Sequence, residues 1–311
     1  MNMNEEMRRE FVPKGWTEKN IPSQSGKRFL ITGGTSGLGM ASARALVNAG
    51  ADVTITARSL SKAKEARSYT GDVKVLELDL TDLSSVRRCA DQINAGPGFD
   101  IVMLNAGIMA PPLAHTRDGF ESQLGTNHLG HFALAGLIRG KICGRVVSIA
   151  SQAHRMGNFR SGSVDDIRDM CLGKGQYSPW GHYGASKLAN ILFTLELERR
   201  RIINGWPITP VVAHPGWSAT HLFKQKNGVA QMVSDAMGRV FAQSAERGAL
   251  PQLCAATIPY IVGGSYLGPR GIGEMRGTPT FVYPKAMAYD QVLAKNLWTV
   301  SEELTGVKWE N

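Results

Sequence analysis

Tyr183 and Lys187 are the two residues whose types and spacing most directly suggest proton-transfer chemistry. They are four positions apart in a stretch with helical character, so both side chains project from the same face of a helix. A free tyrosine has a pKa of about 10, which is too high for proton transfer near neutral pH. A lysine ammonium about 5 Å away, at an effective dielectric constant of about 20, would favour the phenolate by about 3 kcal/mol, or roughly two pKa units. The spacing therefore predicts a proton-exchanging tyrosine, although a helix can carry this pair by chance.

A glycine-rich stretch at residues 32–39 is the second chemical signal. It joins an apolar run to a helical one, and glycine lets a backbone turn sharply and approach a pyrophosphate closely. The helix that follows supplies free N–H groups and positive potential at its N-terminus. We predict a dinucleotide loop here, with a purely structural turn as the alternative. The candidate cofactor residues of the loop are Gly33, Thr35, Ser36, Gly37, Leu38 and Gly39.

The second apolar run ends at Ala57-Arg58, the place that sets specificity for the adenosine ribose. A carboxylate there would hold the 2′-hydroxyl of NAD, and this stretch has none. A guanidinium suits a 2′-phosphate by its charge and by its fork of donors. Arg58 therefore favours NADP (NADPH) as the cofactor, with a solvated loop arginine as the alternative.

The elements that must position these residues are short apolar strands alternating with helices, which predicts a parallel sheet covered on both faces. Ligands bind such sheets at the carboxyl ends of the strands, where the strand order reverses. We predict an α/β chain with one Rossmann-type doubly wound domain. The predicted strands are 29–32, 53–57, 73–78, 101–104, 145–149 and 208–213. A first helix is predicted from the glycine turn through residue 49, a charged helical stretch lies between 57 and 73, and further helices are predicted near 81–94, 117–139 and 181–203.

Several further motifs occur in order along the chain, and with them it resembles the short-chain dehydrogenase/reductase family. The loop has the family's TGxxxGxG spacing, and Asn105-Ala106-Gly107 matches its NAG motif. Pro215-Gly216-Trp217-Ser218-Ala219-Thr220 matches the PGxxxT motif that clasps the nicotinamide end. Asp79, followed by Leu80, matches the acidic residue whose neighbourhood contacts adenine. The resemblance spans about residue 26 to the C-terminus.

The resemblance implies a role for each residue of the chemical centre. Tyr183 exchanges a proton with the substrate oxygen, and Ser151 hydrogen-bonds that oxygen and stabilises its developing charge. Lys187 lowers the tyrosine pKa and holds the nicotinamide ribose. Asn127 positions a water in a proton relay. Hydride transfer itself belongs to the nicotinamide.

Two short stretches, Asp118–Glu121 and Asn127–Phe132, look more like the retinol dehydrogenase and protochlorophyllide reductase branch of the family. We therefore expect a carbonyl or alcohol of an apolar small molecule as substrate, and the resemblance suggests a homodimer or homotetramer. One alternative is reduction of a carbon–carbon double bond. The other is a dinucleotide-binding regulator without turnover, against which the complete set of proton-transfer residues argues.

Three further segments of the chain lie beside the expected site or outside the domain core. Ser151 and Tyr183 are 32 positions apart, so residues 154–180 are predicted to be an insertion, a loop or short helix beside the substrate pocket. Residues 218–247 carry apolar side chains at helical spacing directly after the clasp, which predicts a substrate lid or else a helix packed on the core. Residues 1–25 are predicted to be a polar arm that packs through Phe11 and Trp16, and residues 26–311 a single domain.

The composition excludes several classes of protein. The chain has 311 residues and a net charge of +9, but its basic residues are scattered, so we expect no nucleic-acid partner. It carries no apolar run of about 18 residues, so we expect no membrane span. Four separated cysteines fit a reducing, cytoplasmic setting better than a disulfide framework.

His128 and His131 share a helix face, but no third ligand is near, so we interpret them as packed and hydrogen-bonded and expect no metal. We interpret Cys171 as a loop cysteine of the insertion that has no role in the chemistry.

Overall fold

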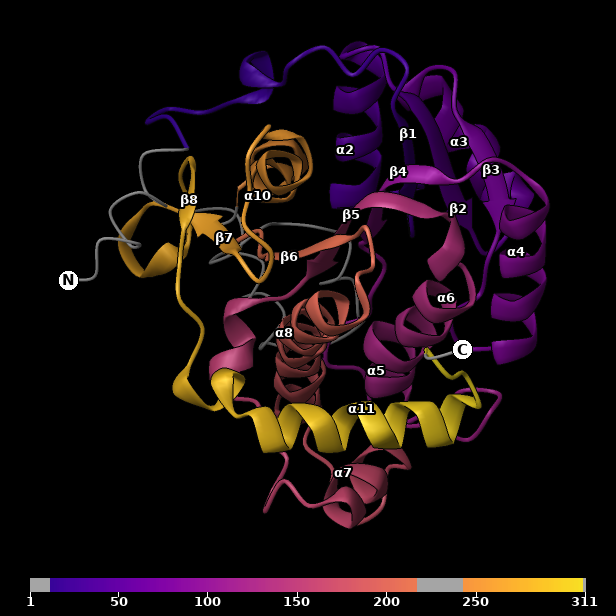
Figure 1. Cartoon of the computed structure of the whole chain (residues 1–311), viewed down its shortest axis with the longest axis vertical. Helices are drawn as coiled ribbons and strands as arrows, with labels where there is room; N and C mark the ends of the chain where they lie inside the picture. The colour runs from indigo at the N-terminus through magenta and orange to yellow at the C-terminus, as the bar shows by residue number, and fades with distance from the viewer. Residues whose placement is uncertain (1–11, 217–242, 310–311) are drawn as a thin grey trace, which may run out of the picture.

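Eight strands form one sheet in the order β3-β2-β1-β4-β5-β6-β7-β8 (Figure 1). The computed structural model describes residues 12–216 and 243–309. Neighbouring strands pair in parallel from β3 to β7, and β8 pairs antiparallel with β7. The strand order reverses between β1 and β4, where ligands bind in sheets of this kind. The strands are β1 (Arg28–Ile31), β2 (Asp52–Ala57), β3 (Lys74–Glu77), β4 (Phe99–Leu104), β5 (Ile142–Ile149), β6 (Thr209–Ala213), β7 (Tyr266–Pro269) and β8 (Pro279–Phe281).

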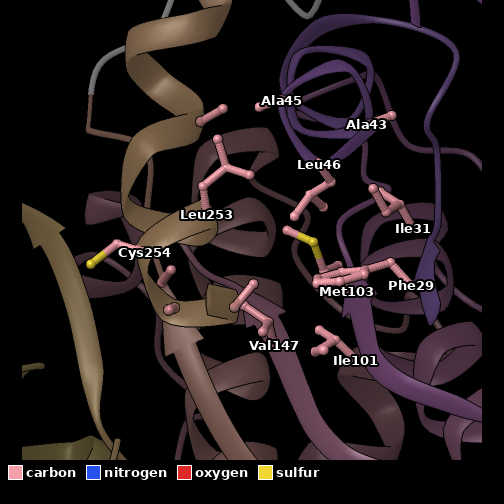
Figure 2. Packing of buried hydrophobic residues seen from close by; sticks show 14 of the residues in the cluster. Phe29, Ile31, Ala43, Ala45, Leu46, Ile101, Met103, Val147, Leu253 and Cys254 are labelled. Atoms are coloured by element: carbon pink, nitrogen blue, oxygen red, sulfur yellow. The ribbon is translucent and has the colours of Figure 1, made fainter. Parts of the chain in front are cut away.

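Side chains alternate between the two faces of the sheet, as strand geometry requires. Phe29 and Ile31 of β1 are buried on one face, and Leu30 between them is buried on the other. The helices that cover the first face are α2 (Gly37–Asn48), α3 (Leu60–Thr70) and α10 (Ala245–Thr257). Figure 2 shows this cluster, with Leu46 from α2 and Leu253 from α10 among the strand side chains. The doubly wound α/β fold predicted from the sequence is therefore confirmed.

The second face is covered by three helices and a fourth laid over them (Figure 1). The three are α4 (Leu83–Ala95), α6 (Gly130–Leu137) and α8 (Pro179–Asn204), and the fourth is α11 (Gln291–Thr305). Trp298 of α11 stacks on Phe193 of α8 with ring centroids 5.8 Å apart, and it meets Phe132 of α6 edge-on at 5.1 Å. These aromatic contacts lock α8, the helix of Tyr183 and Lys187, between the sheet and the C-terminal helix.

The helix predicted at 117–139 begins later than expected. Gly119 adopts a φ of +85°, and the Glu121 carboxylate caps the backbone N–H groups of Gln123 and Leu124. The helix then runs through α5 (Ser122–Leu124), a five-residue π-helical segment η2 (Gly125–Leu129) and α6. A π segment inside a helix shifts the register of its carbonyl groups and is frequent at functional sites. Asn127 lies within it.

The predicted insertion at 154–180 contains one short helix. The turn η4 (Gln152–Arg155) follows Ser151, and α7 (Val164–Cys171) begins where the Ser163 hydroxyl accepts from the Asp166 amide. Helix α7 packs on α11. Cys171 is fully buried, which agrees with a structural role.

Four elements after β6 have no counterpart among the predicted ones, apart from the first three residues of α10, which fall in the predicted lid: α10, β7, β8 and α11. The two strands are three and four residues long and carry proline, so their own pattern is weak. The remaining short turns are η1 (Glu18–Asn20), η3 (Arg139–Lys141), η6 (Ile272–Glu274) and η7 (Ala286–Tyr289).

The two segments that frame the domain are described only in part. Trp16 of the N-terminal arm is 2% exposed and joins the first core cluster, as predicted, whereas Phe11 lies outside the described residues. Residues 218–242 of the predicted lid also lie outside them. Its last residues, 243–247, are described: Ser244 caps α10, whose first turn follows.

Candidate active site

Tyr183 and Lys187 lie in the first turns of α8, and the predicted shared face is confirmed. The helix begins at Pro179, and the Ser178 hydroxyl accepts from the Gly181 amide as its cap. Tyr183 and Lys187 are 7% and 4% exposed, and Lys187 Nζ is 5.7 Å from the Tyr183 ring centroid. Lys187 donates to the Ile149 carbonyl at the end of β5 (3.1 Å). The pair is therefore tied to the carboxyl edge of the sheet.

Ser151 reaches Tyr183 although 32 positions separate them in the chain. It follows β5 directly and caps η4, accepting from the Ala153 amide (3.2 Å). Its side chain is hydrogen-bonded to Tyr183. Since β5 ends beside α8, the sheet brings together two residues that sequence reasoning could connect only through the family resemblance.

Asn127 is fully buried, and its side chain is occupied by neighbouring groups. Its Oδ1 accepts from the Ile108 amide (2.8 Å), and its Nδ2 lies 3.0 Å from the Ile108 carbonyl and 2.9 Å from Ser186 Oγ. Ser186 in turn donates to the Tyr183 carbonyl (2.8 Å). The Asn127 side-chain amide thus ties the π segment to the helix of the tyrosine, and its main-chain carbonyl lies 3.1 Å from His131 Nδ1.

Burial dominates the ionisation of the central pair. It raises the pKa of Tyr183 to about 12, against which the Ser151 hydrogen bond acts, and it lowers the pKa of Lys187 to about 8. The lowered tyrosine pKa expected from the sequence is therefore wrong for the described residues. The reason is that removing a phenolate from water costs more free energy than its attraction to the distant Lys187 ammonium contributes. The arrangement holds a neutral phenol, which suits a proton donor.

A cleft of about 350 Å³ opens at the carboxyl ends of β1, β2, β3 and β4. Most residues of the predicted cofactor site line it. They are Gly33, Thr35, Ser36, Gly37, Leu38, Gly39, Arg58, Asp79, Leu80, Asn105, Ala106 and Gly107. Six lining residues are not among the predicted cofactor residues: Thr56, Ala57, Leu78, Thr81, Ile108 and Thr126. The sequence could have indicated these residues, because each lies within three positions of a predicted site residue or of a predicted strand end.

Close backbone packing shapes the floor of this cleft. A Cβ on Gly39 would lie 2.4 Å from the Gly33 carbonyl oxygen and 2.5 Å from Asn105 Nδ2, so only glycine fits there. Asn105 Nδ2 donates to the Thr32 carbonyl (2.8 Å), and the Asn105 amide donates to the Thr32 hydroxyl (2.8 Å). The glycine loop and the NAG motif are therefore one rigid unit, with the N-terminus of α2 open to the cleft.

The two ends of the cleft differ in character. Arg58, at the end of β2, is exposed and lines the cleft. Asp79 lines it too, and its carboxylate accepts from the amide and hydroxyl of Thr81 (2.9 and 2.7 Å). At the other end, a Cβ on Gly107 would lie 3.4 Å from Lys187 Nζ. The cleft therefore runs from a cation at Arg58 to Gly107, which lies beside Lys187; neither Tyr183 nor Lys187 lines the cleft itself.

The predicted nicotinamide clasp is described in part. Pro215 and Gly216 follow β6 and lie beside the 271–277 loop, whereas Trp217 and Thr220 lie outside the described residues. Neither Pro215 nor Gly216 lines the cleft itself. This stretch is one strand beyond Ser151, since β5 and β6 are neighbours in the sheet.

His128 and His131 are packed and hydrogen-bonded, as interpreted from the sequence. His128 Nε2 lies 2.8 Å from Ser301 Oγ, and His131 Nε2 lies 2.8 Å from Thr32 Oγ1. Burial lowers their pKa values to about 3 and about 4, so both imidazoles are neutral. Within residues 12–216 and 243–309, no group of three or more His, Cys, Asp or Glu side chains is placed to hold a metal ion. In the same part of the chain no helix is long and apolar enough to cross a membrane.

Comparison with known proteins agrees with the fold and the motifs. The short chain dehydrogenase family profile matches residues 27–163. Polyprenol dehydrogenase of Mus musculus is 34% identical over 306 residues, covering 92% of this chain and 86% of the relative. Human retinol dehydrogenase 14 is 34% identical over 311 residues, covering 91% and 87%. A crystal structure of an uncharacterised protein from Mycobacterium paratuberculosis, 40% identical, superposes with a TM-score of 0.81 over 96% of this chain and all of that one.

The chain therefore belongs to the short-chain dehydrogenase/reductase family. Its relatives place it in the retinol-dehydrogenase-like branch, which confirms the finer resemblance drawn from the two short stretches.

Proposed function

We propose that the protein is an NADP(H)-dependent oxidoreductase that transfers a hydride between the nicotinamide and a carbonyl or alcohol of an apolar small molecule. The observation that carries the proposal is the continuity of the site: one cleft runs from Arg58 to Gly107, Gly107 lies beside Lys187, and Lys187 contacts Tyr183, which is hydrogen-bonded to Ser151. The cleft fits a dinucleotide because its Gly39 floor admits a close pyrophosphate and the N-terminus of α2 supplies donors. The bound nicotinamide would supply or accept the hydride.

In this proposal the chain's own residues manage the proton. Tyr183, a neutral phenol in the described structure, donates its proton to the oxygen of a carbonyl under reduction. Ser151 donates to the same oxygen and stabilises its developing charge. Lys187 binds the nicotinamide ribose and favours the tyrosinate that is left. Asn127 positions the water through which the proton is replaced.

Two observations support an apolar substrate. Trp180, which is 44% exposed, lies edge-on to Tyr183 with ring centroids 6.0 Å apart, so an aromatic surface borders the reacting hydroxyl. The relatives are named for retinol and polyprenol, both apolar alcohols. A screen of NADPH oxidation with all-trans-retinal, steroid, quinone and aromatic carbonyls, followed by product analysis, tests the proposal. An alcohol product is expected. A saturated carbon–carbon bond beside an intact carbonyl, or cofactor binding without turnover of any probe, would contradict it.

Arg58 carries the NADP assignment, and its replacement is expected to abolish cofactor preference. A guanidinium at the end of β2 pairs with a 2′-phosphate by charge-assisted hydrogen bonds. We expect NADPH to bind at least about tenfold more tightly than NADH, or about 1.4 kcal/mol. Arg58→Ala should make the two affinities equal by fluorescence titration. Arg201→Ala, which removes an arginine paired with Glu198 at the far end of α8, should retain the preference. Equal wild-type affinities would refute the assignment.

The family resemblance also supports a homodimer or homotetramer, which light scattering after gel filtration measures directly. We propose a cytoplasmic location for the protein, and the four cysteines, all free thiols, are compatible with a reducing compartment.

A further inference from the structure

A histidine–glutamate pair lies beside the nicotinamide clasp and outside the proposed proton-transfer set. His214 directly precedes Pro215 and is 1% exposed. Its Nδ1 accepts from the Gly216 amide (3.2 Å), and its Nε2 is 3.0 Å from Glu274 Oε2. Because a nitrogen that accepts from an amide carries no proton, the Nε2 atom must carry the proton and donate it to the carboxylate. This hydrogen-bond pattern is that of a neutral imidazole, and burial lowers the pKa of His214 in the same direction. The imidazole links the clasp to Glu274.

Glu274 also contacts the turn that carries Ser151. Gln152, the next residue after that serine, donates its side-chain amide to Glu274 Oε2. Arg155 at the end of the same turn places Nη2 3.6 Å from Glu274 Oε1. One carboxylate therefore touches both the serine turn after β5 and, through His214, the clasp after β6.

Two local features of the backbone show that the sequence imposes this arrangement of His214 and Glu274. Glu274 has a φ of +56°, a left-handed conformation that is strained for a residue with a side chain and persists only where surrounding contacts impose it. On β7, a Cβ at Gly268 would lie 2.0 Å from His214 Nε2, so the strand leaves room for the imidazole only because it has glycine there.

The same loop holds the clasp at a second point. Gln243 Nε2 is 3.4 Å from the Pro215 carbonyl oxygen and 3.3 Å from that of Met275, while its Oε1 accepts from the Gly277 amide (3.2 Å). The loop of residues 271–277 is thus joined to Gly216 through His214 and Glu274, and to Pro215 through Gln243. Both described residues of the clasp are fixed to it.

From these contacts we propose that Glu274 is a positioning residue: through His214 it holds Pro215–Gly216 at a set distance from the Ser151 turn, so that the nicotinamide end is bound beside the reacting hydroxyls. This proposal rests on the cofactor site proposed above. It differs from a merely structural role in one respect. The loss of Glu274 should weaken contacts to the nicotinamide half of the cofactor and leave the adenosine half, at Gly39 and Arg58, unaffected.

The test compares NADPH with 2′,5′-ADP, which lacks the nicotinamide, in fluorescence and calorimetric titrations of the full chain. We expect Glu274→Ala to weaken NADPH binding by about tenfold and 2′,5′-ADP binding by less than about twofold. Glu274→Gln keeps an acceptor for His214 and Gln152, so it should restore NADPH affinity to within about threefold of the wild type. Glu303→Ala, which removes a carboxylate paired with Arg168 away from the site, should change neither affinity.

A second readout needs no ligand. The Gly216 amide should exchange with solvent faster in Glu274→Ala than in the wild type by NMR, because His214 is no longer held to accept from it. Equal weakening of both ligands, or an unchanged NADPH affinity with unchanged Gly216 exchange, would overturn the positioning role. A wild-type chain that binds neither ligand would refute the cofactor site. In that case Gly216 exchange would still report on the Glu274–His214 link.

Discussion

Replacing Tyr183 by Phe should lower turnover by about 10²-fold or more, because it removes the proposed proton donor together with its hydrogen bond to Ser151. The ring would remain packed against Trp180 and close to Lys187, so NADPH affinity should change by less than about twofold. Steady-state rates with all-trans-retinal and NADPH titration measure the two quantities separately.

The matched control is Tyr69→Phe. Tyr69 donates its hydroxyl to Glu246 (2.7 Å), outside the cofactor cleft, so the same atom is removed without touching the site. That variant should keep its turnover to within about twofold. A Tyr183→Phe enzyme that kept most of its activity would show that the proton comes from another group.

Lys187→Met is expected to abolish turnover and yet to make the cofactor-free protein more stable at neutral pH. Burial lowers the pKa of Lys187 from 10.5 to about 8, so the folded state binds its proton less tightly than the unfolded state does. The difference corresponds to roughly 3 kcal/mol of destabilisation below pH 8. Methionine removes that cost, and the Ile149 carbonyl keeps the Asn190 side chain as its donor (3.0 Å).

The sign of this effect fixes its pH dependence. Below about pH 8 the lysine is protonated in both states and the full cost applies; between pH 8 and 10.5 the folded state loses the proton first and the cost fades. Chemical denaturation should therefore show the largest gain for Lys187→Met at pH 7 and almost none near pH 10.5. Lys141→Met also removes a lysine that donates to a carbonyl, that of Gly96 (2.9 Å), and should give no gain. A Lys187→Met protein less stable than the wild type at pH 7 would contradict the prediction.

Such a result would identify Lys187 as a residue kept for function at the expense of stability. A buried ammonium beside a buried phenol is a poor arrangement for folding, and activity is the usual reason that such arrangements exist.

The local pattern of apolar and polar residues was sufficient to predict the helices and strands that this pattern itself determines. Each predicted strand overlaps an observed one, because buried parallel strands such as Phe99–Leu104 are continuous apolar runs. The shared face of Tyr183 and Lys187 follows from helix periodicity alone. The glycine loop was recognised because its turn, its helix N-terminus and its close packing all require particular residues at particular spacings.

Strands β7 and β8 and the delayed start of the helix at Ser122 were beyond pattern reading. A three- or four-residue strand owes its existence to its neighbour: β7 forms where Val212 and Ala213 of β6 offer a free edge. The helix start depends on the Glu121 carboxylate turning back as a cap, which competes with a stretch that is otherwise helical.

Only the tertiary structure decided the electrostatics and the long-range contacts of the site. Sequence spacing predicted a lowered pKa for Tyr183, but burial by elements from the whole chain raises it, since desolvation depends on everything packed around a group. His214 and Glu274 are 60 positions apart and share no periodicity, so no window of sequence connects them. The local sequence thus determined the chemistry of single residues and of helix faces. The folded sheet determined the distances between the ends of its strands and the exclusion of water from the groups packed there.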